Sequence, residues 1–160
     1  MREIFEIVGG RPLSGLVKVS GAKNAALPLL ISSILSSGRV TIGNVPDLDD
    51  IAATIRLLRS LGAHVEQRGD VVTISTPKIE STVAPYSAVK AMRASFWALG
   101  PLLARAGEAR VALPGGDAIG GRPVDIHLKG LQQMGADVRM QHGVIVARAP
   151  GGLRPVRVVM

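Results

Sequence analysis

The sequence has no cysteine, and its 160 residues include only one tryptophan, one tyrosine and two phenylalanines. The lack of cysteine excludes both a disulfide framework and a thiolate nucleophile. The three histidines, His64, His127 and His142, are too scattered along the chain to predict a metal site. So few aromatic side chains offer no platform on which bases could stack, and the basic residues are dispersed. We therefore expect no nucleic-acid partner.

Long hydrophobic runs are also missing. No stretch of about 18 uninterrupted apolar residues occurs, and the first residues lack the successive charged, apolar and small-residue regions of a signal peptide. We therefore expect a cytoplasmic protein with no membrane partner. The formal net charge of +7 favours anions, and small phosphorylated ligands rank above polynucleotides.

The composition that remains is typical of a soluble α/β domain with a real core: 47% of the residues are hydrophobic, with 19 glycines and 10 prolines. Apolar periodicity and turn residues locate the elements along the chain. Strands are expected within residues 4–19, 39–42 and 110–113, helices over 25–35, 47–61, 87–106 and 124–134, and hairpins over 65–75 and 138–147. The helix over 25–35 is apolar almost all round, which predicts burial on most sides.

Three of the expected helices carry one apolar face each, spaced for a helical period. The predicted inward residues are Ile51, Ile55, Leu58 and Leu61 in the second helix, Val89, Met92, Phe96, Leu99 and Leu103 in the third, and Val124, Leu128, Leu131 and Met134 in the fourth. These faces predict that the helices form the core of the domain.

The order helix, strand, helix, hairpin occurs twice. The run Leu58–Val65 aligns with Leu131–Val138, at an offset of 131 − 58 = 73 residues. A repeat of this length predicts units that stack with helices inside and sheets outside, and such units seldom bury their faces alone. The alternative is that two helix ends with a Gly-Ala pair match by chance.

The candidate functional loop is Leu113–Asp125, which holds four glycines, Asp117 and Arg122 between a predicted strand and a predicted helix. Pro123 suits the first helical position. The loop would then end on a helix N-terminus, where free N–H groups favour an anion, and Arg122 would add a planar, two-pronged donor. We predict a loop that binds an anionic substrate. A glycine-rich connector with a solvated arginine is the alternative, because such loops without a full motif are weak signals.

Three motifs resemble those of the UDP-N-acetylglucosamine enolpyruvyl transferases. They are Ser20–Pro28, Met92–Pro101 and the loop from Leu113 through Arg122-Pro123-Val124-Asp125 to His127. They occur in the family's order and the resemblance runs nearly end to end. The pair Lys23-Asn24 distinguishes this family from its shikimate-pathway relatives, which share the fold. The resemblance implies an α/β fold of repeated helix-strand-helix-hairpin units, an inside-out barrel that is incomplete here.

The activity implied by the resemblance is transfer of the enolpyruvyl group of phosphoenolpyruvate to the 3-hydroxyl of UDP-N-acetylglucosamine, the first committed step of peptidoglycan synthesis, without metal or other cofactor. Two anionic substrates must meet, so fixed cations are required. By the match, Lys23 would hold phosphoenolpyruvate, with Asn24 beside it. Arg93 and Arg122 would bind the nucleotide sugar. The residues implied at the uridine end are Pro123, Val124, Asp125 and Ile126.

Trp97 follows Arg93 by four residues, so on an α-helix the two would share a face and could wall the sugar. Each residue also has an ordinary interpretation. Lys23 could be a surface charge at a helix start, Arg93 a charge on a helix face, and Trp97 a core residue.

Asp117 stands where the family usually carries a loop cysteine, the residue that the antibiotic fosfomycin alkylates. The resemblance therefore implies a protein insensitive to fosfomycin, with Asp117 as the general acid of the reaction. Without the resemblance, a loop aspartate that accepts local N–H groups and caps a turn would be the preferred interpretation.

Family members are more than twice as long, with two domains of three units each. The resemblance assigns residues 1–21 to strands that join the sheet of the second domain, and residues 22–160 to about two units of the first. We expect little activity from these 160 residues alone, and either self-association or a complementing C-terminal half. A non-catalytic nucleotide-sugar-binding module and half of a split enzyme are the alternatives.

Overall fold

The structure is a computed structural model that describes residues 4–84, 93–113 and 124–157. Its elements run in the order α1 (Lys23–Ser32), η1 (Ser33–Leu35), β1 (Arg39–Ile42), α2 (Asp49–Ser60), β2 (His64–Arg68), β3 (Val71–Ser75), β4 (Val83–Ala84), η2 (Arg93–Ala98), α4 (Leu99–Ala106), β5 (Glu108–Ala112), α5 (Asp125–Gln133), β6 (Asp137–Gln141) and β7 (Val144–Arg148), where η marks a 3₁₀ helix.

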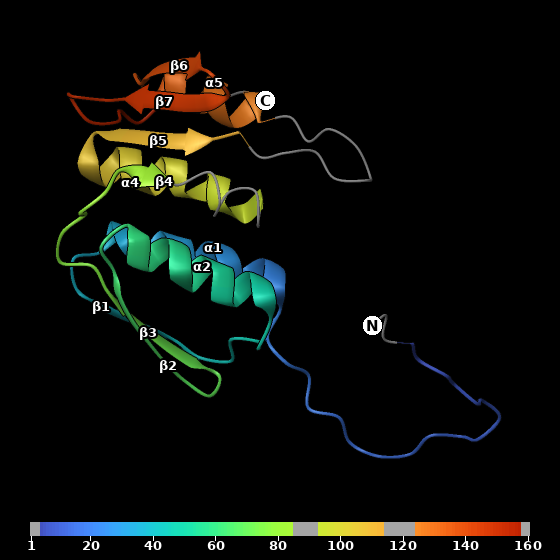
Figure 1. Cartoon of the computed structure of the whole chain (residues 1–160). Coiled ribbons are helices and arrows are strands. Elements are labelled where there is room, and N and C mark those ends of the chain that lie inside the picture. The colour runs from blue at the N-terminus through green and yellow to red at the C-terminus, as the bar shows by residue number, and fades with distance from the viewer. Residues whose placement is uncertain (1–3, 85–92, 114–123, 158–160) are drawn as a thin grey trace.

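Two sheets enclose a layer of helices (Figure 1). The first sheet has the strand order β1-β3-β2 and the second the order β4-β5-β7-β6. The helices α1, α2 and α4 lie between them, with α4 next to the second sheet. Leu30, Leu58 and Leu102, one from each of these helices, have no exposed surface. The predicted arrangement, with helices inside and sheets outside, is confirmed.

Both predicted hairpins are present. The strands β2 and β3 pair antiparallel up to Arg68 opposite Val71, and β6 and β7 pair up to Gln141 opposite Val144. Each turn contains a glycine in the left-handed region, with φ of +59° at Gly69 and +76° at Gly143. A residue with a Cβ adopts this conformation at a cost, which is why these turns favour glycine.

The first helix is buried on one face rather than on most sides. Leu27 and Leu30 lie in the core, but Leu29 and Leu35 are each 53% exposed. They line an open groove along β1, together with Val40 and Ile42 of that strand. The prediction was wrong for this face because no described residue covers it, although the side chains are as apolar as those of the buried face.

The helix predicted over 87–106 is observed from Arg93 as η2 and continues from Leu99 as α4. Its predicted start, with Val89 and Met92, lies outside the described residues. Phe96, Leu99 and Leu103 are buried as predicted, and Leu102 is buried as well. The helix ends at Gly107, whose φ of +74° forms a left-handed cap.

Residues 4–20 form no strand, so the prediction of strands within 4–19 is wrong for this structure. Every residue in this segment is exposed, including Ile4 at 91% and Leu16 at 104%, and the segment runs away from the helices and sheets (Figure 1). A strand needs a neighbour for its backbone hydrogen bonds, and no described strand pairs with this segment. The assignment of residues 1–21 to a second domain's sheet is not tested and stays a prediction.

The repeat extends to individual hydrogen bonds at the ends of α2 and α5. The amide of Ala63 donates to the carbonyl of Leu58 at 3.0 Å, and the amide of Ala136 donates to that of Leu131 at the same distance. These bonds belong to Schellman caps around Gly62 and Gly135, whose φ values are +104° and +95°. Chance similarity of two short runs would not reproduce this geometry, so the offset of 73 residues marks a true repeat.

The offset changes inside each unit. Arg39 pairs with Ser75 as Glu108 pairs with Arg148, so the first strands correspond at 108 − 39 = 69 and the last strands at 148 − 75 = 73. The second unit therefore has 73 − 69 = 4 additional residues between its first strand and the end of its second helix. The loop between β5 and α5 has 124 − 112 = 12 residues, against 48 − 42 = 6 between β1 and α2, and it is the loop that we predicted to bind an anionic substrate.

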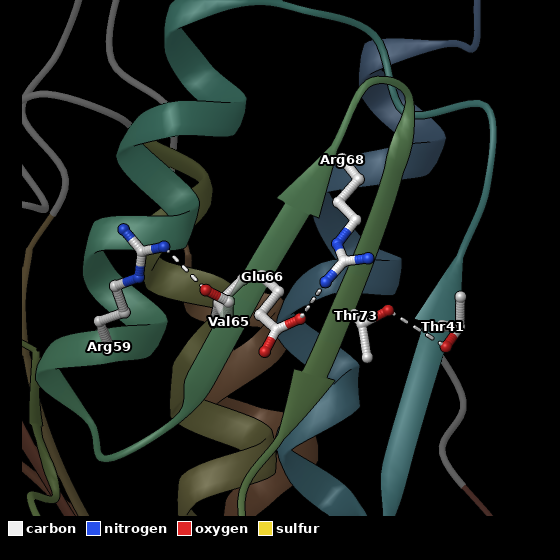
Figure 2. Close-up of polar contacts among 6 residues, drawn as sticks. All are labelled: Thr41, Arg59, Val65, Glu66, Arg68 and Thr73. Carbon is white, nitrogen blue, oxygen red and sulfur yellow. Dashed lines mark hydrogen bonds and ion pairs between the residues drawn. The ribbon is translucent and has the colours of Figure 1, made fainter.

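The outer face of the first sheet is polar and solvent-facing. The hydroxyl oxygens of Thr41 and Thr73 lie 3.4 Å apart, and Glu66 and Arg68 form an ion pair at 3.7 Å (Figure 2). Both charged side chains of that pair are more than 70% exposed, so it contributes little to stability. On the other side of β2, the guanidinium of Arg59 donates to the carbonyl of Val65 at 2.8 Å and ties α2 to the hairpin.

Arg105 joins the two units. From α4 of the second unit, its guanidinium donates to four carbonyls of the first unit. The acceptors and distances are Ile34 at 2.7 Å, Ser36 at 3.0 Å, Thr76 at 2.5 Å and Pro77 at 3.0 Å. These carbonyls lie at the ends of η1 and β3, so one charged side chain bonds the backbone at two places of the first unit.

Candidate functional site

The predicted site residues fall into three groups. Lys23 and Asn24 open α1, Trp97 lies on η2, and Val124, Asp125 and Ile126 surround the start of α5. Asp117, Arg122 and Pro123 lie outside the described residues. Arg93 begins η2, but nothing is described of its side chain.

Lys23 lies where two helices begin. Its Nζ is 2.8 Å from Oδ2 of Asp50, which is in the first turn of α2, and the two side chains are 48% and 34% exposed. The first turn of α1 has no acidic residue and no side-chain cap, so its N–H groups and the ammonium present positive charge to solvent. Sequence analysis did not identify Asp50 as the partner of Lys23.

Close packing explains the glycine at position 21, the second residue of the motif Ser20–Pro28. A Cβ at Gly21 would lie 1.7 Å from the carbonyl oxygen of Asn44, so no other residue fits without moving the backbone. Asn44 itself has a left-handed φ of +54°. The close contact holds the start of α1 against the loop that follows β1, and so positions Lys23. Sequence analysis assigned the motif to binding and missed this packing role.

Trp97 is not a core residue. It is 39% exposed, while its neighbour Phe96 is 4% exposed and makes an edge contact with His127 at a centroid distance of 6.0 Å. The segment η2 is a 3₁₀ helix with three residues per turn, so the α-helical spacing from which we predicted a shared face for Arg93 and Trp97 does not apply. The binding roles of both residues stay predictions.

The start of α5 divides the residues predicted for the uridine end. Val124 is 8% exposed and packs in the core, whereas Ile126 is 55% exposed. Asp125 is the first helical residue, two positions after the predicted one, and its carboxylate lies 4.0 Å from Nζ of Lys129. Asp125 and Ile126 are therefore available to a ligand, while Val124 anchors the end of the loop.

The three groups are connected through η2, which packs against both α1 and α2. This packing brings the segment that carries Trp97 beside the helix that begins with Lys23. The helix α5 packs against β6 and contacts η2 through the ring pair of His127 and Phe96. At the start of α1, Lys23 and Asn24 present an ammonium and an amide beside free backbone N–H groups, an arrangement that suits an anion.

Residues 4–84, 93–113 and 124–157 contain no group of three or more His, Asp or Glu side chains placed to hold a metal ion. In the same ranges, no helix has both the length and the apolar character to span a membrane.

On the outer face of the second sheet, a hydrogen bond from Arg139 to Asp137 raises the pKa of the arginine, which stays charged.

The sequence of this chain matches one family of known proteins and is similar to several of its members. The family described as EPSP synthase (3-phosphoshikimate 1-carboxyvinyltransferase) matches residues 7–159. A UDP-N-acetylglucosamine 1-carboxyvinyltransferase of Cellvibrio japonicus is 54% identical over 157 residues, which are 98% of this chain and 37% of that protein. The enzyme of the same name from Photobacterium profundum is 50% identical over 160 residues, all of this chain and 38% of that protein.

Solved structures of an enolpyruvyl transferase and an EPSP synthase have a fold similar to that of this chain. The crystal structure of the enolpyruvyl transferase NikO from Streptomyces tendae has a TM-score of 0.77 and 26% identity, covering 92% of this chain and 32% of that one. An EPSP synthase from Acinetobacter baumannii, at a TM-score of 0.56 and 21% identity, shows the same fold over 82% of this chain and 31% of its own.

The chain thus spans between 37% and 38% of the length of these curated relatives. The match to the family covers almost all of it, and the predicted repeat of helices inside and sheets outside is observed. The resemblance inferred from three sequence motifs is therefore confirmed: the chain belongs to the EPSP synthase family of enolpyruvyl (1-carboxyvinyl) transferases.

Proposed function

We propose that this chain contributes to an enzyme that transfers the enolpyruvyl group of phosphoenolpyruvate to the 3-hydroxyl of UDP-N-acetylglucosamine. The observation that carries the proposal is the identity of 50–54% over essentially the whole chain to proteins named for this activity. The reaction commits UDP-N-acetylglucosamine to peptidoglycan and takes place in the cytoplasm. It uses no metal or other cofactor, so positioned side chains supply the charge stabilisation.

Lys23 is the proposed ligand of phosphoenolpyruvate. Its ammonium stands at the uncapped start of α1, and its partner Asp50 is only partly buried. A phosphate or carboxylate of the substrate would compete with Asp50 for the ammonium and would also meet the free N–H groups of α1. Asn24, the next residue, is exposed and adds an amide donor at the same place.

Arg93 and Arg122 are the proposed ligands of the nucleotide sugar, with Trp97 beside the sugar. Two observations support this assignment. Trp97 is partly exposed over an apolar groove, and the loop that carries Arg122 is six residues longer than its counterpart in the first unit. With Pro123 and the buried Val124 holding the loop end, the exposed Asp125 and Ile126 are proposed to contact the uridine.

Asp117 is the proposed general acid, which delivers a proton to the methylene carbon of phosphoenolpyruvate as the sugar oxygen adds. An aspartate in water is ionised at neutral pH. The role therefore requires that the loop exclude water and that substrate phosphate approach the carboxylate, since both favour the protonated form. The positive charge of Arg122 opposes this, so the substrate must engage the arginine at the same time.

The proposal is tested by measuring phosphate release with both substrates. We expect little or no turnover from the 160-residue chain alone, and turnover when it is co-expressed with the C-terminal remainder of the Cellvibrio japonicus relative. A chain that binds UDP-N-acetylglucosamine without phosphate release in either state would instead be a binding module, the alternative function. Turnover by the verified monomer alone would contradict the need for a second part.

Variants of the complemented enzyme test the loop. Arg122→Ala should cost about 2–5 kcal/mol of substrate binding or transition-state stabilisation, because a bound anion loses a charge-assisted partner. Arg68→Ala, which removes an exposed arginine from the first hairpin, is the matched control.

Asp117→Asn should abolish turnover, and Asp117→Cys should restore it together with sensitivity to fosfomycin. The pH–rate profile of each variant is also measured. Full turnover by Asp117→Asn, with the acid limb of this profile unchanged, would exclude Asp117 as the proton donor.

A further inference from the structure

The outer face of the second sheet has a hollow of about 130 Å³ over the strands β5, β7 and β6. Three arginines, one from each strand, are part of its lining. The lining residues are Arg110, Asp137, Arg139, Gln141, Val146 and Arg148. They share the outer face because side chains alternate along a strand, and their neighbours Ala109, Ile145 and Ala147 are fully buried on the inner face. The three arginines are exposed, so the hollow is open to solvent.

The register of the sheet gathers the arginines around Val146. Arg110 of β5 and Arg139 of β6 are both directly opposite Val146, one on each side of β7. Arg148 follows Val146 by two positions on the same strand and therefore lies on the same face. Opposite residues on neighbouring strands are about 5 Å apart, and alternate residues of one strand about 7 Å apart, which an arginine side chain can bridge. Three guanidinium groups can thus reach one point above an apolar floor.

The carboxylate in the lining belongs to Asp137, and Arg139 already engages it. Nε of Arg139 donates to Oδ1 and Oδ2 of Asp137 at 3.2 and 3.0 Å, and Nη2 lies 3.0 Å from Oδ2. This contact holds one edge of the guanidinium and leaves the N–H groups of Nη1 for another acceptor. Asp137 therefore orients Arg139 without using all of its donors.

The other two arginines have no such partner. Within residues 4–84, 93–113 and 124–157, the side chains of Arg110 and Arg148 form no ion pair. Glu108 is opposite Arg148 in the register, but its carboxylate accepts a hydrogen bond from the hydroxyl of Thr82 at 3.2 Å and does not line the hollow. Three arginines and Asp137 give the lining a net charge of 3 − 1 = +2.

The first unit shows that the fold does not require these arginines. Since 110 − 69 = 41, 139 − 73 = 66 and 148 − 73 = 75, the counterparts of the three arginines are Thr41, Glu66 and Ser75. Thr41 and Glu66 are both opposite Thr73, the counterpart of Val146, on the outer face of the first sheet (Figure 2). The same sheet thus forms with hydroxyls and a carboxylate at these positions. Three like charges around one valine repel one another, and a bound anion would remove this repulsion.

We propose that the hollow on the outer face of the second sheet binds a phosphate group through Arg110, Arg139 and Arg148. The net charge of +2 matches a phosphate dianion, and the planar guanidinium donors match its oxygens. A hollow of about 130 Å³ suits a single small oxyanion, because pockets for larger ligands begin at roughly 300 Å³. Inorganic phosphate and the phosphate of a small ester share this chemistry. The proposal does not rest on the enolpyruvyl transfer proposed above.

The experiment follows the arginine Nε–H signals of the 160-residue chain by nuclear magnetic resonance during titration with sodium phosphate. Sodium chloride at the same ionic strength is the reference titration, and single Arg→Gln variants assign the signals. We expect the signals of Arg110, Arg139 and Arg148 to shift along one binding curve. Those of Arg39 and Arg68, on the outer face of the first sheet, should respond to phosphate as they do to chloride. Equal responses of all five arginines to the two salts would overturn the proposal.

Two variants measure what each arginine contributes to phosphate affinity. Arg110→Gln and Arg148→Gln should each weaken phosphate binding about tenfold, because the anion loses a charge-assisted donor. Neither side chain has an ion pair to lose, so both variants should melt like the unchanged chain in the absence of phosphate. Arg39→Gln, at an exposed position of β1, is the matched control and should leave the affinity unchanged. Affinities of Arg110→Gln and Arg148→Gln equal to that of Arg39→Gln would overturn the proposal.

Further titrations distinguish the source of the anion. A response of the same three signals to glycerol phosphate would assign the hollow to phosphate esters as well as to free phosphate, and a response to inorganic phosphate alone would assign it to the free ion. Tighter binding of acetate or of a glutamate-rich peptide than of phosphate would overturn the assignment, and would indicate an acidic protein as the partner of this face.

Lys23→Ala separates this site from the proposed substrate site, where phosphate would be a reaction product. Because Lys23 lies at the start of α1 and does not line the hollow, the variant should leave the response of the three arginine signals unchanged, whether or not the proposed function is correct. Loss of that response in Lys23→Ala would place the phosphate at the start of α1 and would overturn the proposal.

Discussion

The two repeat units, α1 through β3 and β4 through β7, have the same plan but different surroundings. Both end their second helix with a Schellman cap and both continue into a hairpin of matching register. The second helix of the first unit is nevertheless closed in, with Leu58 and Leu61 fully buried, while Leu131 and Met134 of the second remain partly exposed. Similar sequence patterns therefore reach different burial because burial depends on the neighbouring unit.

The loops that join the first strand to the second helix also differ between the two units. In the first unit the loop between β1 and α2 is short and packs closely on Gly21, with the carbonyl of Asn44 against it. The corresponding loop of the second unit, residues 113–124, is six residues longer than residues 43–48 and carries Asp117 and Arg122. The short loop packs against Gly21, and the longer loop carries two of the residues proposed above to act on the substrates.

The largest expected effect contrasts the matching leucines. Leu58→Ala should destabilise the chain by about 2.5–5 kcal/mol, because it opens a cavity in a fully buried site. Leu131→Ala should cost roughly 1–2 kcal/mol, since the groove beside Leu131 is already open and less contact is lost. Urea unfolding monitored by circular dichroism measures both. Equal losses would show that the two helices are equally buried in solution.

The connection between the units gives the next effect. Arg105→Met should destabilise the chain by about 2–4 kcal/mol, because four carbonyls of the first unit lose a charged donor while most of the aliphatic packing is kept. Arg148→Met, on the exposed end of β7, serves as the control. A loss for Arg105→Met no greater than that of the control would mean that the two units do not depend on this side chain.

The two caps provide a smaller contrast. Alanine at Gly62 or Gly135 must adopt a left-handed φ, at a cost of roughly 1–2 kcal/mol. Gly62→Ala should cost more than Gly135→Ala, because its Cβ would approach the backbone nitrogen of Glu80 at 2.9 Å, whereas the Cβ at Gly135 meets open space. Thermal melts of both variants check the order. A larger loss at Gly135 would contradict the contacts described for these caps.

The smallest effect concerns an ion pair that belongs to the first unit alone. Asp50→Asn should lower stability by no more than about 1 kcal/mol, because Lys23 and Asp50 are partly exposed and screened by solvent. The loss should shrink further at high salt, as melting temperatures at two ionic strengths would show. The control is Glu66→Gln, which removes a fully solvated pair and should have no measurable effect. A salt-independent loss would indicate that Asp50 acts through packing.

Much of the fold could be predicted because local patterns specified it. The hairpins follow from strand alternation around Gly69 and Gly143, and the helix ends follow from Gly62 and Gly135. The repeat was visible at the same helix ends. The family was recognisable from motifs that carry chemistry, such as Lys23-Asn24, since those residue types are constrained by the substrates they meet.

Other features could not be predicted because they depend on contacts between distant segments. In the sequence, Arg105 is an ordinary basic residue near a helix end. In the structure, it donates hydrogen bonds to four carbonyls of residues at least 28 positions away. Asp50 reads as a helix-start acid, and only the packing of α1 on α2 brings it to Lys23. Trp97 was placed with Arg93 by α-helical spacing, but the segment forms a 3₁₀ helix.

The sequence by itself determined the local conformations, the order of the elements and the family to which the chain belongs, because backbone propensity, apolar periodicity and motif chemistry are encoded within a few residues. Only the tertiary structure decided which apolar faces are covered. Residues 4–20 contain many apolar side chains but remain exposed, and the inner face of α5 is only partly buried, whereas that of α2 is fully buried. Burial requires a partner surface, and a partner distant in the chain leaves no local trace in the residues that it covers.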